Sequence, residues 1–80
     1  MAEWYTIYTK DDCKWCVKAK ELLQVMGLDY YEKDLNNPKY FEEWKALGVK
    51  TVPQVMKEET LIGGYEKLER HLNVKNKLGK

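Results

Sequence analysis

Two cysteines, Cys13 and Cys16, are separated by Lys14 and Trp15, and they are the only cysteines of the 80-residue chain. A bridge between them closes a loop too short to restrain the unfolded chain appreciably, so a structural staple explains the pair poorly. The spacing suits thiol–disulfide exchange, because residues i and i+3 of a helix are neighbours and Cys16 can reach the sulfur of Cys13. The pair therefore predicts redox chemistry.

The predicted place of the cysteine pair, at the first turn of a helix, favours a thiolate at Cys13. Free N–H groups and the helix dipole place partial positive charge there, and Lys10 and Lys14 add formal positive charge nearby. The thiolate is the nucleophile in disulfide exchange. We therefore predict that Cys13 is the exposed attacking nucleophile and that Cys16, one turn further along the helix, is the buried resolving thiol.

A Cys-x-x-Cys pair is also half of a zinc site. Structural zinc takes four ligands, and the chain offers one histidine, His71, in its last predicted helix. A complete site would need a second chain or carboxylate ligands. We therefore predict no metal site and no tightly bound cofactor, and we expect His71 to lie on the surface or at a helix end.

The composition indicates a soluble globular protein, with 44% hydrophobic and 34% charged residues. The 14 basic and 13 acidic residues give a net charge of +1, which provides no basis for a nucleic-acid partner. Charges interrupt every apolar run before the roughly 20 residues of a membrane span, and the N-terminus lacks a secretory-signal pattern. We expect a single domain over residues 1–80 that acts as a cytoplasmic monomer.

The first half of the chain predicts a strand, a helix and a second strand. Residues 3–9 are aromatic and β-branched, which is typical of a strand. Residues 13–26 have helical periodicity, with Asp12 as the expected N-cap and Gly27 as the expected stop. Residues 28–33 read as the second strand. The apolar face of the helix is formed by Ala19, Leu22, Leu23 and Met26.

The second half predicts a helix, a hairpin and a final helix. Asn37 and Pro38 suit the cap and first position of a helix, whose expected buried stripe is Phe41, Trp44 and Leu47. A hairpin follows, with strands at residues 52–57 and 60–62, and then a last helix marked by Tyr65, Leu68 and Leu72. The order β-α-β-α-β-β-α predicts an α/β fold in which three helices flank a four-stranded mixed sheet.

Three motifs in this order resemble a glutaredoxin, a small dithiol member of the thioredoxin superfamily, over nearly the whole chain. They are Lys10-x-x-Cys13-x-x-Cys16, Thr51-Val52-Pro53-Gln54 and Gly63-Gly64-Tyr65. The resemblance implies a thioredoxin-like fold with sheet order 2-1-3-4. It also implies glutathione as the electron donor and co-substrate.

The resemblance assigns a glutathione site around these motifs. It implies that Pro53 is cis and faces the reactive cysteine, with the Val52 backbone free to pair with an extended peptide. Gly64 would let the ligand approach the backbone closely, and the free N–H groups at the start of the last helix would bind the γ-glutamyl carboxylate. Lys10 would pair with the glycine carboxylate, and Trp15 would flank the tripeptide. The predicted binding residues are Lys10, Trp15, Thr51, Val52, Pro53, Gly64, Tyr65 and Glu66.

Three positions depart from the family pattern. Lys14 and Trp15 stand where its commonest motif has proline and tyrosine, and Glu66 stands where aspartate is usual. We expect the Lys14 charge to stabilise the Cys13 thiolate and hence the reduced form. This would place the reduction potential near or above the less negative, more oxidising end of the range of about −200 to −230 mV that glutaredoxins show.

The resulting prediction is a glutathione-dependent oxidoreductase that reduces protein disulfides and glutathione mixed disulfides. Two alternatives stay open. One is a redoxin of similar size that is reduced by thioredoxin reductase and serves ribonucleotide reductase. The other is an iron–sulfur or metal-binding module in which the first cysteine and glutathione hold a cluster between two subunits.

Overall fold

The computed structural model describes residues 4–73, which contain four strands and three helices. The observed order confirms the predicted β-α-β-α-β-β-α pattern. The predicted strand start at residue 3 lies outside the described residues. The elements are β1 (Tyr5–Thr9), α1 (Lys14–Val25), β2 (Tyr30–Asp34), α2 (Pro38–Ala46), β3 (Gln54–Lys57), β4 (Thr60–Gly63) and α3 (Tyr65–Leu72).

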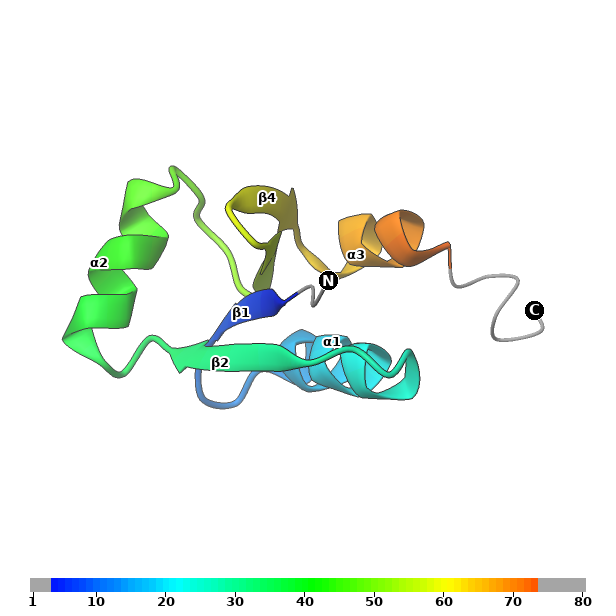
Figure 1. The fold of residues 1–80 in the computed structure, drawn as a ribbon. Helices are drawn as coiled ribbons and strands as arrows, with labels where there is room; N and C mark the ends of the chain where they lie inside the picture. Colours follow the sequence, from blue (N-terminus) through cyan, green and yellow to red (C-terminus); the bar gives the residue numbers. More distant parts are fainter. Residues whose placement is uncertain (1–3, 74–80) are drawn as a thin grey trace.

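The four strands form one mixed sheet in the order β2-β1-β3-β4 (Figure 1). β1 and β2 are parallel, as expected for strands joined by a crossover helix. β3 is antiparallel to both β1 and β4, and the hairpin turns at Glu58, whose φ is +53°. The predicted sheet order 2-1-3-4 is therefore confirmed.

The hydrophobic core lies between one face of the sheet and the helices α1 and α3. Alternate residues of β1, Tyr5 and Ile7, point to this face together with Val55 of β3. Leu23 of α1 and Leu68 of α3 are fully buried against them. The helical face predicted for α1 is confirmed, with Ala19 and Leu22 in the core and Met26 packed at its margin.

The start of α1 corrects the predicted cap. Asp12 has a positive φ of +54° and is not the N-cap. Cys13 takes that position in an extended conformation, and its sulfur accepts a hydrogen bond from the Cys16 N–H at 3.1 Å. Aspartate tolerates the left-handed conformation, whereas an N-cap residue takes an extended one. The predicted stop is confirmed, because Gly27 has a φ of +72° just beyond the helix.

Helix α2 lies at the opposite end of the molecule from α1 and α3 (Figure 1). Its predicted start is confirmed, since Asn37 caps it and Pro38 is its first residue. Its predicted buried stripe is wrong, because none of its residues is buried and Phe41 is 38% exposed. Polar contacts attach this helix to the sheet instead: Tyr8 Oη and Lys33 Nζ donate to Glu43 at 3.2 and 2.9 Å.

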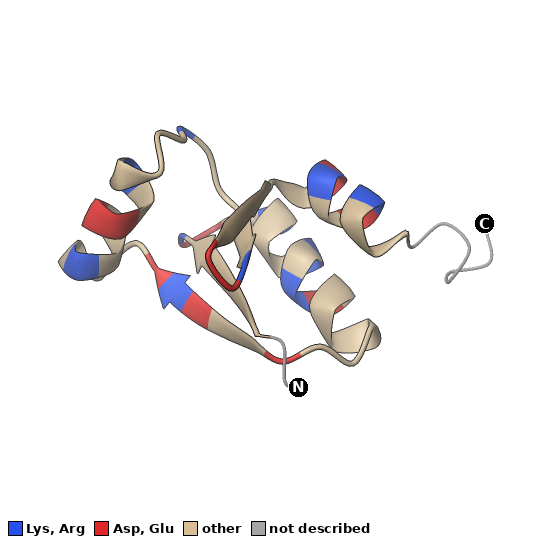
Figure 2. Cartoon of the chain, turned by 45° about the horizontal axis from the view of Figure 1, so that its top comes forward, with Lys and Arg blue, Asp and Glu red and all other residues tan. Residues whose placement is uncertain are grey.

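Acidic and basic residues are interspersed over both the helices and β2 (Figure 2). This distribution agrees with the near-zero net charge of the chain. Within residues 4–73, no helix combines the length and the hydrophobicity that a membrane crossing requires.

Candidate active site

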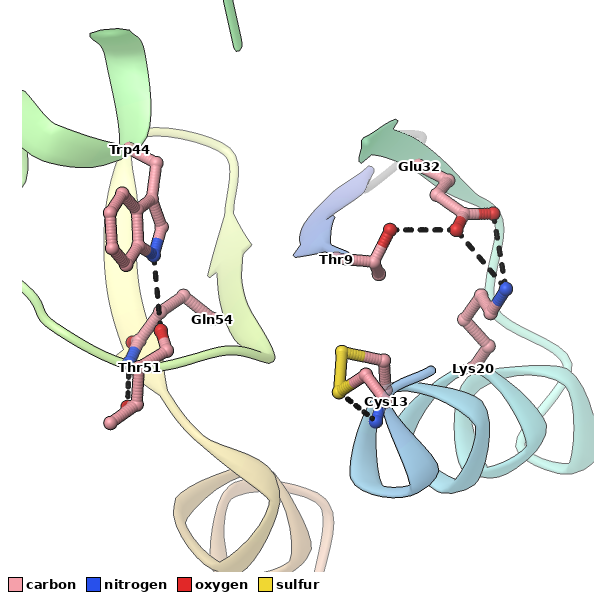
Figure 3. The surroundings of a disulfide bond; sticks show 8 residues. Thr9, Cys13, Lys20, Glu32, Trp44, Thr51 and Gln54 are labelled. Carbon is pink, nitrogen blue, oxygen red and sulfur yellow. Dashed lines mark hydrogen bonds and ion pairs between the residues drawn. A yellow bond between two sulfur atoms is a disulfide. The ribbon is translucent and has the colours of Figure 1, made fainter. Parts of the chain in front are cut away.

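Cys13 and Cys16 form a disulfide at the start of α1, with their Cα atoms 5.2 Å apart (Figure 3). Cys13 is half-buried, whereas Cys16 is 2% exposed. The capping hydrogen bond from the Cys16 N–H directs a backbone donor at the Cys13 sulfur. A donor in this position stabilises negative charge on that sulfur when the disulfide opens. The greater burial of Cys16 relative to Cys13 confirms the predicted difference in exposure between the two cysteines.

A cavity of about 440 Å³ lies beside the disulfide, and we call it the disulfide cavity. Its polar wall comes from three elements. Thr9 at the end of β1 donates to Glu32 of β2 at 2.8 Å, and Lys20 of α1 binds the same carboxylate at 3.1 and 3.2 Å (Figure 3). The lining residues are Thr9, Lys10, Asp12, Cys13, Lys14, Cys16, Val17, Lys20 and Glu32.

The Glu32 carboxylate is held ionised by its two neighbours. Its partial burial acts to raise its pKa, but the hydrogen bonds from Thr9 and Lys20 outweigh burial, and the pKa lies below its ordinary value. The disulfide cavity thus contains a paired ammonium and carboxylate beside the sulfurs. Sequence reasoning missed Thr9, Lys20 and Glu32, because they come from three elements and share no local motif.

A second cavity of about 660 Å³ runs beside the segment that precedes β3, and we call it the Pro53 groove. The Val52–Pro53 peptide bond is cis, as the resemblance implied. Seven of the eight predicted binding residues line this one groove: Trp15, Thr51, Val52, Pro53, Gly64, Tyr65 and Glu66. The groove also includes residues that were not predicted to bind the ligand: Val49, Gln54, Leu61, Ile62, Gly63 and Lys67.

Two aromatic side chains form part of the groove wall. Trp15 follows Cys13 by two residues, and its ring centroid lies 5.2 Å from that of Tyr65, with the planes inclined at 47°. Trp15 is 52% exposed, and Lys18 Nζ lies 5.7 Å from its ring centroid. The two rings therefore contribute apolar surface to the wall of the groove.

The backbone on the opposite wall is fixed by side-chain hydrogen bonds. Trp44 Nε1 donates to the Thr51 carbonyl at 3.0 Å, and Gln54 Nε2 donates to the Thr51 hydroxyl at 3.1 Å (Figure 3). Within the described residues, no hydrogen bond engages the backbone of Val52. The N-terminus of α3 also has no side-chain cap, since Gly64 is its N-cap. Both features leave backbone groups available along the groove.

Lys10 is set apart from the other predicted binding residues. It is exposed and does not line the Pro53 groove. It lines the disulfide cavity and a further cavity that also contacts Thr51 and Val52. Lys10 therefore borders both the cysteine pair and the Thr51–Val52 segment.

The model of the glutaredoxin family matches residues 5–62 of the chain. The chain belongs to the glutaredoxin family. Glutaredoxin 3 of Escherichia coli K12 is 41% identical over 64 residues, which cover 78% of this chain and 77% of that protein. The hybrid peroxiredoxin hyPrx5 of Haemophilus influenzae is 39% identical over 67 residues, and the chain spans 28% of its length.

Solved glutaredoxin structures share the fold. Glutaredoxin 1 of Francisella tularensis, complexed with cacodylate, has a TM-score of 0.71 and 27% identity over 99% of this chain and 100% of that one. The glutaredoxin-like NrdH-redoxin of Escherichia coli has a TM-score of 0.75 and 25% identity over 86% and 93%. A buckwheat glutaredoxin–glutathione complex has a TM-score of 0.71 and 25% identity over 89% and 70%.

The fold is therefore thioredoxin-like, as predicted. The chain is an oxidoreductase of the glutaredoxin family, with Cys13 and Cys16 as a redox-active, disulfide-forming pair.

Proposed function

We propose that this glutaredoxin is a glutathione-dependent enzyme that reduces protein disulfides and glutathione mixed disulfides. The observation that carries the proposal is the convergence of seven predicted binding residues on the Pro53 groove, next to the helix that holds the disulfide. These residues come from three separate parts of the chain. Their meeting at one cavity supports a site for one extended ligand.

The groove offers the contacts that a γ-glutamyl tripeptide requires. The unpaired backbone of Val52 can pair with the peptide as an added strand does. The uncapped N-terminus of α3 presents the N–H groups of Tyr65 and Glu66 to a carboxylate. Trp15 and Tyr65 supply an apolar wall. Similarity to the buckwheat glutaredoxin, which was solved with glutathione, supports the same ligand.

The proposed cycle begins with the reduced pair. The Cys13 thiolate attacks a substrate disulfide, forming a mixed disulfide and releasing one substrate thiolate. The Cys16 thiolate, after its proton passes to solvent, attacks the Cys13 sulfur, which releases the second substrate thiolate and leaves the Cys13–Cys16 disulfide. One glutathione thiolate then attacks the Cys13 sulfur, which forms a mixed disulfide with Cys13 and releases the Cys16 thiolate. The thiolate of a second glutathione attacks the sulfur of the first, which releases oxidised glutathione and restores the Cys13 thiolate.

The test is a disulfide-reduction assay coupled to glutathione, glutathione reductase and NADPH. We expect turnover by the wild type and none by Cys13→Ser. The Cys16→Ser variant separates two routes, because loss of activity in both variants indicates a two-thiol route and loss in Cys13→Ser alone indicates a one-thiol route. Failure of the wild type to turn over with glutathione would contradict the proposal.

A second candidate donor is thioredoxin reductase. It is favoured by the likeness to the NrdH-redoxin of Escherichia coli, a glutaredoxin-like protein described as having a thioredoxin-like activity profile. The same assay with thioredoxin reductase in place of glutathione and its reductase distinguishes the two donors. Turnover in that arm alone would assign the second function, with ribonucleotide reductase as the protein substrate to test.

A further inference from the structure

A fourth cavity, of about 560 Å³, lies between β4 and α3, and we call it the basic groove. None of its lining residues carries a carboxylate, whereas Lys67 and Arg70 of α3 and Lys57 of β3 carry positive charge. Glu69 of α3 does not enter it and interacts with the Tyr65 hydroxyl instead. Figure 2 shows the basic positions along α3. The lining residues are Lys57, Thr60, Leu61, Ile62, Lys67, Arg70 and His71.

One wall of the basic groove is an open sheet edge. β4 is the last strand of the sheet, and within residues 4–73 it pairs with β3 alone. Thr60 and Leu61 of this strand are exposed. An edge strand offers a row of backbone donors and acceptors to an extended chain, so the groove combines main-chain pairing groups with cationic side chains.

The basic groove continues into the Pro53 groove, because Leu61, Ile62 and Lys67 line both. A polypeptide whose cysteine is held in the Pro53 groove can therefore extend along β4 past Arg70. Arg70 lines the basic groove and not the Pro53 groove, so a tripeptide that occupies the Pro53 groove does not require it.

We propose that the basic groove binds an acidic, extended segment of protein disulfide substrates, adjacent to the cysteine that Cys13 attacks. The segment pairs with the β4 edge, and its carboxylates lie against the cationic side chains of α3. This inference rests on the proposed function and names the substrate class that the same site prefers. It predicts selectivity among protein disulfides and leaves reduction of glutathione mixed disulfides unaffected.

The test uses peptides whose single cysteine is linked by a disulfide to 2-nitro-5-thiobenzoate. The Cys13 thiolate of the reduced protein attacks the peptide sulfur, and the coloured thiolate leaves with the bonding electron pair. One disulfide is exchanged for another, so no other oxidant or reductant is needed. Each acidic peptide carries four glutamates and has a partner with four glutamines. In one pair of peptides the four-residue segment precedes the cysteine, and in the other pair it follows the cysteine. Both arrangements are needed because a chain that pairs with β4 runs in one direction only.

We expect the wild type to react about fivefold faster with the acidic peptide of one pair, the size expected for a few exposed charge contacts. Arg70→Glu should abolish this preference, and Arg70→Lys should retain most of it. The matched control is Lys39→Glu, which makes the same change of charge on the exposed surface of α2. This control should keep the preference.

Two results would overturn the inference: no preference in either pair, or equal loss of preference in Arg70→Glu and Lys39→Glu, which would reflect net charge alone. All variants are also assayed with a glutathione mixed disulfide, where we expect unchanged rates. If the wild type turns over the glutathione mixed disulfide normally but shows no selectivity between the peptides, only the inference about the basic groove is contradicted. Absent turnover by the wild type contradicts the proposed function itself.

Discussion

Lys20 Nζ lies 3.2 and 3.1 Å from the two carboxylate oxygens of Glu32, and this ion pair lines the cavity beside the Cys13–Cys16 disulfide. Lys20 follows Cys16 by four residues, so the two side chains share a face of α1. Thr9 fixes the carboxylate from the end of β1. The two charges balance each other. Removal of either one leaves the other to change the pKa of the Cys16 thiol in the reduced protein.

The first prediction concerns the ionisation of Cys16 in the reduced protein. Glu32→Gln leaves the ammonium of Lys20 unbalanced, which should lower the pKa of the Cys16 thiol. Lys20→Met leaves the carboxylate unbalanced and should raise it. Both shifts should be modest, because the side chains of Lys20 and Glu32 are partly exposed. Thiolate absorbance against pH, measured in a Cys13→Ser background, reports Cys16 alone.

The control for this titration is Lys33→Met, which removes a lysine paired with Glu43 outside the disulfide cavity. It should leave the Cys16 pKa unchanged. Shifts of the same sign in Glu32→Gln and Lys20→Met would contradict the electrostatic explanation.

The second prediction concerns the reduction potential. Lys14 is the first residue of α1, a position where proline fits well, so Lys14→Pro removes the charge without breaking the helix. We expect a more negative potential, because the lost charge stabilised the Cys13 thiolate of the reduced form. Equilibration in glutathione redox buffers measures it. Lys14→Gln separates charge from rigidity, and an unchanged or higher potential in both variants would refute the prediction.

The third prediction concerns glutathione recognition by Trp15. Trp15→Ala removes the ring that packs against Tyr65 in the Pro53 groove, and it should raise the KM for a glutathione mixed disulfide severalfold. Trp4→Ala is the matched control, because Trp4 is similarly exposed, at 44% against 52%, and lies outside the groove. Equal KM values for the two variants would show that Trp15 takes no part in binding.

The sequence pattern was most informative where local rules decide the structure. Periodicity located α1, and Asn37 with Pro38 located the start of α2. The cap of α1 was mispredicted, because both Asp12 and Cys13 carry an acceptor and only the backbone conformation distinguishes them. The burial of α2 was mispredicted for a different reason. Its apolar residues have helical spacing, but spacing does not reveal whether another layer covers them.

The residues of the candidate site also fall into two groups: those that local motifs reveal and those that only the assembled fold brings together. Cys13 and the seven predicted binding residues of the Pro53 groove lie in or next to short motifs, so their types and order could be recognised in the sequence. The ion pair of Lys20 with Glu32 depends on β2 lying parallel to β1 and beside α1. The basic groove likewise depends on β4 being the edge strand next to α3. Such neighbours appear only when the sheet is assembled.

The fourth prediction concerns stability at low pH. The hydrogen bond from Lys33 lowers the pKa of Glu43 from its ordinary value of 4.5. The unfolded state therefore binds more protons there, and this stabilisation is present above pH 4.5 and is lost as pH falls through the lower folded pKa. Glu43→Gln should reduce the free energy of unfolding at pH 7 by about 0.5 kcal/mol, a value that allows for solvent screening.

Urea denaturation at pH 7 and pH 3 measures this effect, and the difference between wild type and Glu43→Gln should shrink at the lower pH. Glu42→Gln is the control, because Glu42 is 70% exposed and lies 3.9 Å from Lys45. A pH-independent difference for Glu43→Gln would assign its effect to packing of α2 rather than to ionisation.

The fifth prediction separates the roles of two adjacent glycines. Gly63 has a φ of +123°, and a Cβ there would lie 2.6 Å from Lys67 Cδ. Gly64 has an ordinary φ of −80°, and its Cβ would meet the Pro53 carbonyl oxygen at 3.7 Å. Gly63→Ala should therefore lower the free energy of unfolding by about 1–2 kcal/mol. Gly64→Ala should leave stability nearly unchanged and raise the KM for a glutathione mixed disulfide.

Urea denaturation and steady-state kinetics on both variants provide the measurement. The double variant Gly63→Ala/Lys67→Ala separates the steric cost at position 63 from the conformational cost, because it removes the 2.6 Å contact with Lys67 Cδ and keeps the unfavourable φ. We expect partial recovery of stability in that variant. If Gly64→Ala were the more destabilising substitution, or if it bound glutathione normally, the assignment of Gly63 to backbone geometry and of Gly64 to ligand approach would be wrong.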